Sequence, residues 1–170
     1  RIPAVTHISS EFRNNDTVIN PKAIYLAVSQ SGETADTISA IKEIKLKGGQ
    51  VFGVVNVVGS TIARLCGKGV YIHSGPEQSV ASTKAFTNMV AALTIFATQL
   101  GRTRHLSKDE GRELMQALQQ TPHLMETYLE DIGPIDEAVN LLCEANSVLF
   151  LGRGLSATVA KEGALKLMEL

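Results

Sequence analysis

Three hydroxyl side chains and one glycine follow an apolar run near the start of the chain. Ser29, Ser31 and Thr34 lie within six positions, and Gly32 stands between them. Helical periodicity begins just after them, and the first turn of a helix offers backbone N–H groups without intrahelical partners at the positive end of its dipole. An oxyanion can be held there without Lys or Arg, so this loop is predicted to bind phosphate at the carboxyl end of a strand.

The competing interpretation of this loop is that its hydroxyl groups only cap the helix, which is a common use of Ser and Thr. The number of hydroxyl groups favours phosphate, as does Gly32, which can adopt φ > 0 and let the backbone approach a ligand closely. The pattern GxxxxGK[ST] is absent, so a nucleoside triphosphate is not the expected ligand.

Three charged residues near the end of the chain have the spacing of one helix face. Glu162, Lys166 and Glu169 are four and three positions apart. One interpretation is a solvent-facing strip of ion pairs, each worth about 0.2–0.5 kcal/mol. The other is a carboxylate and an ammonium group that face a cleft and transfer a proton. Spacing alone favours the first interpretation, because such pairs are common on ordinary helices.

A loop between these two segments, residues 75–86 with the sequence GPEQSVASTKAF, precedes a long apolar helix. Its hydroxyl groups, among them those of Ser82 and Thr83, can bind sugar hydroxyls or cap the helix. Lys84 is a cation at a helix amino end, where the dipole disfavours it. This departure from local preference is a weak indication of function.

A glycine-rich turn, residues 152–157 with the sequence GRGLSA, matches the dinucleotide fingerprint GxGxx[GA]. The acidic residue that would bind the ribose falls about 20 positions further on, beyond Leu170. Tight entry into a helix explains both glycines, and this interpretation is favoured over dinucleotide binding.

Composition indicates a soluble globular protein with a sizeable core. The 170 residues are 44% hydrophobic and carry a formal net charge of −1, which gives no electrostatic reason to bind nucleic acid or a membrane surface. The longest apolar stretch, residues 86–100, is shorter than a membrane helix requires. Cys66 and Cys143 form no metal-binding pattern, so no metal is expected and both are interpreted as reduced thiols of a cytoplasmic protein.

Strands and helices are expected to alternate in the first part of the chain. This order is typical of a parallel sheet covered on both faces. The predicted strands are residues 23–28, 51–56 and 70–73, with helices at 34–47 and 60–66 between them. Residues 81–100 are apolar on nearly every side, which predicts a buried helix.

The second part of the chain is predicted to be mainly helical. Two amphipathic helices are expected, at 107–119 with Ser107 and Glu110 as a capping box and at 121–132 with Pro122 at a first helical position, and a further helix starts at 134–143. A strand at 147–151 and a largely buried helix at 155–170 then resemble the start of a second α/β unit. The chain is expected to be a fragment, with a domain at 1–133 and a truncated one at 134–170.

Several motifs together resemble one known family, the isomerase part of the glutamine:fructose-6-phosphate aminotransferases, also called glucosamine-6-phosphate synthases. They are SSEFRN at 9–14, SQSGETADT at 29–37, NVVGSTIAR at 56–64, VASTKAF at 80–86 and EGALKLMEL at 162–170. The resemblance extends over nearly the whole chain. It implies an α/β fold of the sugar isomerase (SIS) type, an αβα sandwich with a parallel five-stranded sheet flanked by helices, followed here by the start of a second SIS unit, in a homodimer.

The resemblance also implies roles for individual residues. Glu169 would be the acid/base that moves a proton between C1 and C2 of the sugar, and Lys166 would assist it. The residues implied to bind the sugar phosphate are Ser29, Gln30, Ser31 and Thr34 for the phosphate group, and Val80 and Ser82 for the sugar.

The implied reaction is addition of ammonia to open-chain fructose 6-phosphate and isomerisation of the imine to glucosamine 6-phosphate, with no metal or organic cofactor. A glutaminase domain is expected upstream. Two departures from the family pattern lie beside the expected site: Gln78-Ser79 stands where Ile-Gly is usual, and Met168 where Lys is common. Two alternatives stay open, a stand-alone SIS-type ketose isomerase or amino-sugar phosphate deaminase, and a non-catalytic sugar-phosphate-binding module.

Overall fold

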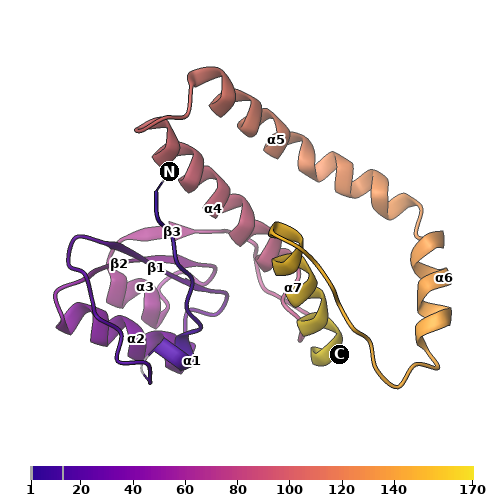
Figure 1. Ribbon diagram of the computed structural model, residues 1–170, viewed down its shortest axis with the longest axis horizontal. Coiled ribbons are helices and arrows are strands. Elements are labelled where there is room, and N and C mark those ends of the chain that lie inside the picture. The colour runs from indigo at the N-terminus through magenta and orange to yellow at the C-terminus, as the bar shows by residue number, and fades with distance from the viewer. Residues whose placement is uncertain (1, 13) are drawn as a thin grey trace. The chain divides into compact units, whose positions relative to one another are not determined.

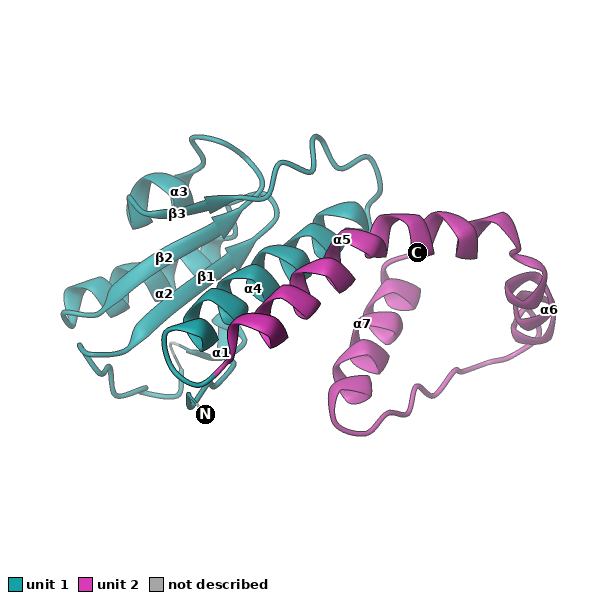
Figure 2. Cartoon of the chain, turned by 90° about the horizontal axis from the view of Figure 1, so that it is seen from above, with its two compact units in different colours: residues 1–105 teal, residues 106–170 magenta. Residues whose placement is uncertain are grey.

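The computed structural model describes residues 2–12 and 14–170 (Figure 1). Arg13, within the SSEFRN segment, lies outside the described residues. The chain divides into two compact units, Arg1–His105 and Leu106–Leu170 (Figure 2). The expected boundary between SIS domains at residues 133 and 134 stays a prediction, because the chain's own contacts do not mark where a second SIS unit begins.

The first unit is built on a parallel sheet in the order β1-β2-β3, as the alternation predicted. Its strands are β1 (Ile24–Ser29), β2 (Gln50–Val55) and β3 (Gly69–Tyr71). The expectation of five strands is wrong for the described residues, where the sheet has three. The number five came from the resemblance to complete SIS domains, whereas the sequence pattern of this unit contains three β-branched runs.

Helices cover both faces of this sheet, with α2 (Ala35–Leu46) and α3 (Thr61–Cys66) on one side and α4 (Lys84–Arg102) on the other (Figure 1). Side chains alternate along the central strand β2, so Val55 packs with α2 and α3 while Val54 packs against α4. The short helix α1 (Ser9–Phe12) adds Phe12 to the α2 side of the core. This arrangement leaves the carboxyl ends of the three strands at one edge of the unit.

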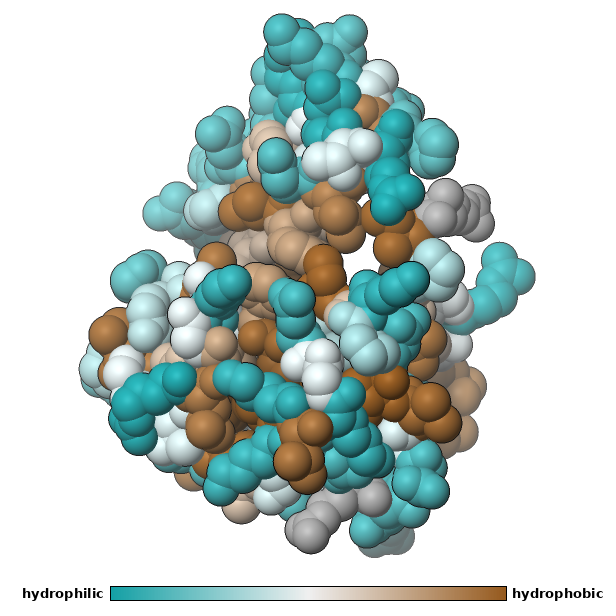
Figure 3. All heavy atoms as spheres, turned by 90° about the vertical axis from the view of Figure 1, so that its left-hand side faces the viewer, coloured by the Kyte–Doolittle hydropathy of each residue, from teal (hydrophilic) through white to brown (hydrophobic). Residues whose placement is uncertain are grey.

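Helix α4 confirms the predicted helix but not its burial. It begins at Lys84 rather than at residue 81, and among its described residues only Ala85 and Thr98 are buried. The sheet covers one stripe of the helix, whereas apolar side chains such as Phe96 on other sides remain exposed. Apolar side chains reach the surface between polar ones on the face shown in Figure 3.

The second unit contains α5 (Lys108–Glu130), α6 (Gly133–Leu142) and α7 (Leu155–Glu169). The prediction of two helices between 107 and 132 is wrong, because α5 runs through Pro122 without a break. Strong helix formers stand on both sides of Pro122, and only Gly111 of this helix is buried, so water can satisfy the carbonyl that the proline leaves without a donor. The capping box at Ser107 is confirmed.

The predicted strand at 147–151 is not formed among the described residues. An extended segment becomes a strand only when a neighbour pairs with its N–H and C=O groups, and no described strand pairs with it. Helix α7 is confirmed, but none of its described residues is buried. The Phe150 ring lies against Gly163, while apolar side chains such as Leu155 and Val159 are exposed.

Candidate functional site

The candidate phosphate loop, residues 29–34, lies between the carboxyl end of β1 and the start of α2. The buried Ser29 hydroxyl accepts a 3.0 Å hydrogen bond from the Gly32 amide and lies 3.1 Å from the Thr34 hydroxyl. Gly32 has φ of +66°, a conformation that favours glycine, and Ser31 Oγ accepts from the Glu33 amide at 3.1 Å. The loop is therefore curled around the Ser29 hydroxyl.

The geometry at the start of α2 bears on the capping alternative. Thr34 is the N-cap residue, yet its side chain makes no capping hydrogen bond. Its hydroxyl pairs with Ser29 instead. The first amides of α2 are therefore not satisfied by the hydroxyl of this N-cap, which is the condition for an oxyanion to bind them.

The candidate phosphate loop is fastened to the loop that follows β2. The Ile62 amide donates to the Gly32 carbonyl at 2.9 Å, and the Thr61 amide donates to Glu33 Oε1 at 2.7 Å. Hydrogen bonding by the Thr61 side chain and backbone lowers the pKa of Glu33 below its usual value. Sequence reasoning missed Glu33, because its partner Thr61 lies 28 positions further on, at the start of another helix, α3 (Thr61–Cys66).

Ser60 packs directly under the candidate phosphate loop. It is 3% exposed, and among the described residues its hydroxyl has no hydrogen-bond partner. A β-carbon on Gly32 would meet the Ser60 hydroxyl. Position 32 therefore requires glycine both for its backbone conformation and for the close approach of the two loops.

The candidate sugar loop, residues 77–83, leads into α4 and is closed by the Glu77 carboxylate. Glu77 Oε2 accepts from the amides of Thr83 and Ala85 at 3.1 and 3.2 Å, and Oε1 accepts from the Thr83 hydroxyl at 3.3 Å. Burial acts to raise the pKa of Glu77, but these hydrogen bonds outweigh it and the pKa is lowered. Thr83 makes no capping bond of its own, so Glu77 caps α4 from six positions upstream.

The residues of the candidate sugar loop differ widely in their exposure to solvent. Ala81 is 1% exposed and anchors the loop, whereas Val80 is 86% exposed and Ser82 is half-buried. Val80 and Ser82 are the two residues expected to contact the sugar. They lie on either side of the buried Ala81, in a loop that the hydrogen bonds of Glu77 hold against the start of α4. Sequence reasoning missed Glu77, whose partners lie six and eight positions away.

The charged residues of α7 interact as their spacing predicts. Lys166 Nζ lies 2.9 Å from Glu169 Oε2 and 3.2 Å from Glu162 Oε1, and the three side chains are 24–32% exposed. The hydrogen bond with Glu169 raises the pKa of Lys166, so this residue is an ammonium group near neutral pH. These residues belong to the second compact unit, and the placement of Glu169 and Lys166 at the sugar phosphate stays a prediction.

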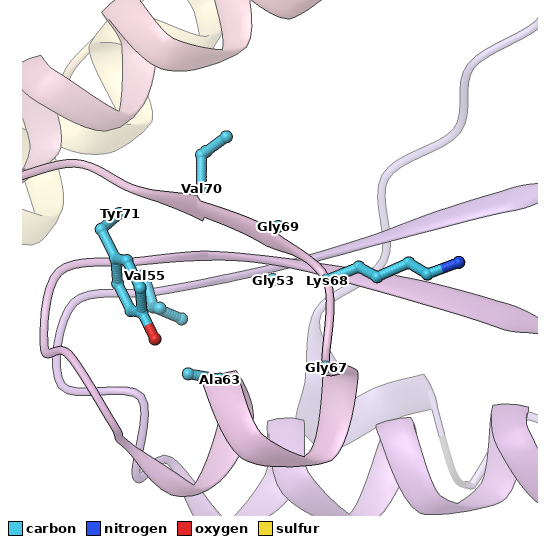
Figure 4. A pocket seen from close by; sticks show the side chains of 8 residues that line it. All are labelled: Gly53, Val55, Ala63, Gly67, Lys68, Gly69, Val70 and Tyr71. Atoms are coloured by element: carbon cyan, nitrogen blue, oxygen red, sulfur yellow. The ribbon is translucent and has the colours of Figure 1, made fainter.

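A pocket of about 210 Å³ lies beside β3 and α3 (Figure 4). Its lining is Gly53, Val55, Ala63, Gly67, Lys68, Gly69, Val70 and Tyr71. None of the residues expected to bind the sugar phosphate is among them. The candidate site of the first unit is therefore not this pocket. It consists of the candidate phosphate loop, after β1, and the candidate sugar loop, which lies between β3 and α4.

The described part of the chain was also searched for clusters of metal-binding side chains and for helices that could span a membrane. Within it, no set of three or more His, Cys, Asp or Glu side chains is arranged to hold a metal ion. Each helix described there is too short or too polar to cross a membrane.

Comparison with known proteins identifies relatives along the whole chain. Curated glutamine–fructose-6-phosphate aminotransferases (isomerizing) from Thermus thermophilus and Chlorobaculum tepidum are 42% and 43% identical over 171 and 170 residues, which is all of this chain. The chain spans 28% of the length of these relatives.

Two solved structures match nearly the whole chain. The C-terminal domain of glucosamine-fructose-6-phosphate aminotransferase from Francisella tularensis matches with a TM-score of 0.93 and 32% identity, over 99% of this chain and 48% of that one. A putative phosphosugar isomerase from Silicibacter pomeroyi matches with a TM-score of 0.77 and 27% identity, over 97% and 48%. The SIS domain family matches residues 1–99, which is more than half of the chain. This chain therefore belongs to the SIS domain family, with strong homology to the isomerase part of the glutamine–fructose-6-phosphate aminotransferases.

Proposed function

We propose that this chain is the sugar-phosphate isomerase part of a glutamine–fructose-6-phosphate aminotransferase. The observation that carries the proposal is the 42–43% identity to curated aminotransferases along the whole chain. The geometry of the candidate phosphate loop supports it independently, because that loop combines a helix start with hydroxyl groups at the carboxyl end of a strand.

In this proposal the first unit anchors the substrate. The phosphate group binds to Ser29, Gln30, Ser31 and Thr34 and to the free amides at the start of α2. Val80 and Ser82 contact the sugar from the candidate sugar loop. This division is supported by the strand order, since both loops follow strands of one parallel sheet at their carboxyl ends.

Glu169 is the proposed catalytic residue. Ammonia adds to the C2 carbonyl of open-chain fructose 6-phosphate and water leaves, which gives an imine. The Glu169 carboxylate removes a proton from C1, which the imine makes acidic, and returns a proton to C2. In the same isomerisation the C1 hydroxyl loses its proton and becomes the aldehyde, while the imine nitrogen gains a proton and becomes the amine. The Lys166 ammonium group lies 2.9 Å from Oε2 of the Glu169 carboxylate and forms an ion pair with it.

The remaining parts of the proposal concern the whole protein. A glutaminase domain would supply the ammonia, and the chain would work in a cytoplasmic homodimer with a second SIS unit beginning near residue 134. The 28% coverage of the curated relatives supports a larger protein of this kind. A stand-alone phosphosugar isomerase is the second candidate, which the similarity to the Silicibacter pomeroyi protein favours.

The test is an assay of the protein expressed from its complete gene. Formation of glucosamine 6-phosphate from fructose 6-phosphate and glutamine is expected. Interconversion of sugar phosphates without any use of glutamine or ammonia would favour the stand-alone isomerase. Binding of fructose 6-phosphate without turnover would replace both with a binding module.

A further inference from the structure

Asn56 lies at the carboxyl end of the central strand β2 and is 9% exposed. Its side-chain amide donates to the Gly75 carbonyl at 2.7 Å, and its side-chain oxygen accepts from the Ser74 amide at 2.8 Å. Its backbone amide donates to the Gln30 carbonyl at 3.3 Å. One residue thus contacts the candidate phosphate loop on one side and the segment that enters the candidate sugar loop on the other.

Residues 74 and 75, which Asn56 contacts, belong to a segment that also forms hydrogen bonds with α4. Asn88 Nδ2 donates to Ser74 Oγ at 2.9 Å and lies 3.4 Å from the Ile72 carbonyl. His73, between them, has φ of +51°, which is uncommon for a residue other than glycine. A backbone in this conformation persists only when its surroundings hold it, so these bonds fix where the chain leaves β3.

The chemistry of this contact fits asparagine in particular. A carboxamide presents one acceptor and two donors in one plane, which matches the N–H of Ser74 and the C=O of Gly75. A carboxylate would place an oxygen against the Gly75 carbonyl, and a serine hydroxyl would not reach both groups. Because the site is buried, a partner left without its hydrogen bond is not readily compensated by water.

We propose that Asn56 is a positioning residue that fixes the candidate phosphate loop and the candidate sugar loop relative to each other, so that one sugar phosphate contacts both. The proposal rests on the proposed function, because it assigns these loops to the two ends of one substrate. Asn56 acts through Gln30 and Gly75 and is not itself a ligand of the sugar. The short path from Gly75 to Glu77, which closes the candidate sugar loop, carries this effect to Val80 and Ser82.

The test compares Asn56→Asp and Asn56→Ser with Asn20→Asp in the protein expressed from its complete gene. Asn20 is the matched control, because its side chain also accepts from a backbone amide, that of Lys22, but it precedes the amino end of β1. Dissociation constants are measured for fructose 6-phosphate, which needs both loops, and for inorganic phosphate, which needs one. Asn56→Ser removes the same two hydrogen bonds without introducing a buried charge. The dissociation constants can therefore be measured with this variant if Asn56→Asp does not fold.

Both Asn56 variants should bind fructose 6-phosphate about tenfold more weakly, the equivalent of ~1.4 kcal/mol, while the constant for inorganic phosphate changes less than about twofold. Asn20→Asp should match the wild type for both ligands. Equal weakening of both ligands, or a lower melting temperature with unchanged constants, would overturn the positioning role and leave the proposed function intact. A wild-type protein that does not bind fructose 6-phosphate would overturn the proposed function, and this inference with it.

Discussion

Glu33 and Thr61, 28 positions apart in the chain, are joined by a 2.7 Å hydrogen bond from the Thr61 amide to the Glu33 carboxylate. Thr61 begins α3, so the carboxylate lies at the positive end of that helix dipole while it closes the candidate phosphate loop. The bond therefore connects the segments that follow β1 and β2, and it gives an acidic residue a structural role beside a proposed anion site.

Replacing Glu33 by Gln should change how stability depends on pH. The folded-state pKa of Glu33 is lowered from its usual value near 4.5, so its contribution to stability is present above that value and is lost as the pH falls through the lowered pKa. The melting temperature of the wild type should therefore decrease more steeply on acidification than that of Glu33→Gln. Thermal melts at a series of pH values measure the difference.

The matched control for this measurement is Glu11→Gln, an exposed acidic residue on α1 in the same unit. Comparison with this variant separates the loss of the bond to Thr61 from the loss of one carboxylate in the same unit. Parallel profiles for all three proteins would mean that the bond to Thr61 contributes nothing to stability.

Gly32→Ala should destabilise the protein more than Gly48→Ala does. Both glycines have positive φ, of +66° and +83°, which costs an L-residue about 1–2 kcal/mol. Only at Gly32 would the new methyl group meet another side chain, that of Ser60, whereas the space around Gly48 is open. The collision should add about 1–3 kcal/mol, measured by denaturant unfolding. Equal losses at the two positions would show that the candidate phosphate loop moves freely away from Ser60.

The local elements of the first unit could be predicted because their causes are local. The runs that became β1 and β2 are apolar and β-branched, and Gly48-Gly49 follows the last turn of α2. The capping box of α5 could also be predicted, since Ser107 and its partner are three positions apart. The curled conformation of the candidate phosphate loop follows from its own hydroxyl groups and glycine.

The contacts that hold the candidate site together could not be predicted in this way. Glu33 meets Thr61, and Asn56 meets Gly75, only after the parallel strands have paired in register. Periodicity reports which face of an element is apolar but not what covers it. For this reason the sequence predicts that α4 and α7 are buried and that the segment at 147–151 pairs. Among the described residues, the sheet covers one stripe of α4, no residue of α7 is buried, and no strand pairs with 147–151.

Ser29→Ala should weaken both the fold and the binding of sugar phosphates. The substitution leaves the buried Gly32 amide without its acceptor, which costs about 1–3 kcal/mol, and removes the partner of the Thr34 hydroxyl. In the wild type, fructose 6-phosphate should raise the melting temperature and fructose should not. The increase should be smaller for Ser29→Ala at the same ligand concentration.

Ser39→Ala, further along α2, is the control for Ser29→Ala because it removes a hydroxyl group from the same unit outside the loop. It should keep the full increase in melting temperature with fructose 6-phosphate. An equal increase with unphosphorylated fructose in the wild type would contradict the assignment of this loop to phosphate.

Glu169→Gln should abolish most turnover while substrate still binds. The amide is nearly isosteric with the carboxylate but cannot accept the C1 proton, so kcat should decrease by about 10²–10⁴-fold with KM changed only a few-fold. Glu162→Gln is the matched control, because Glu162 lies on the same helix and pairs with the same Lys166, at 3.2 Å, but has no proposed part in the reaction. If α7 carries only a strip of ion pairs, the two substitutions should have similar and small effects. A large loss at Glu169 alone separates proton transfer from surface electrostatics, and retained turnover in Glu169→Gln would remove this residue from the mechanism.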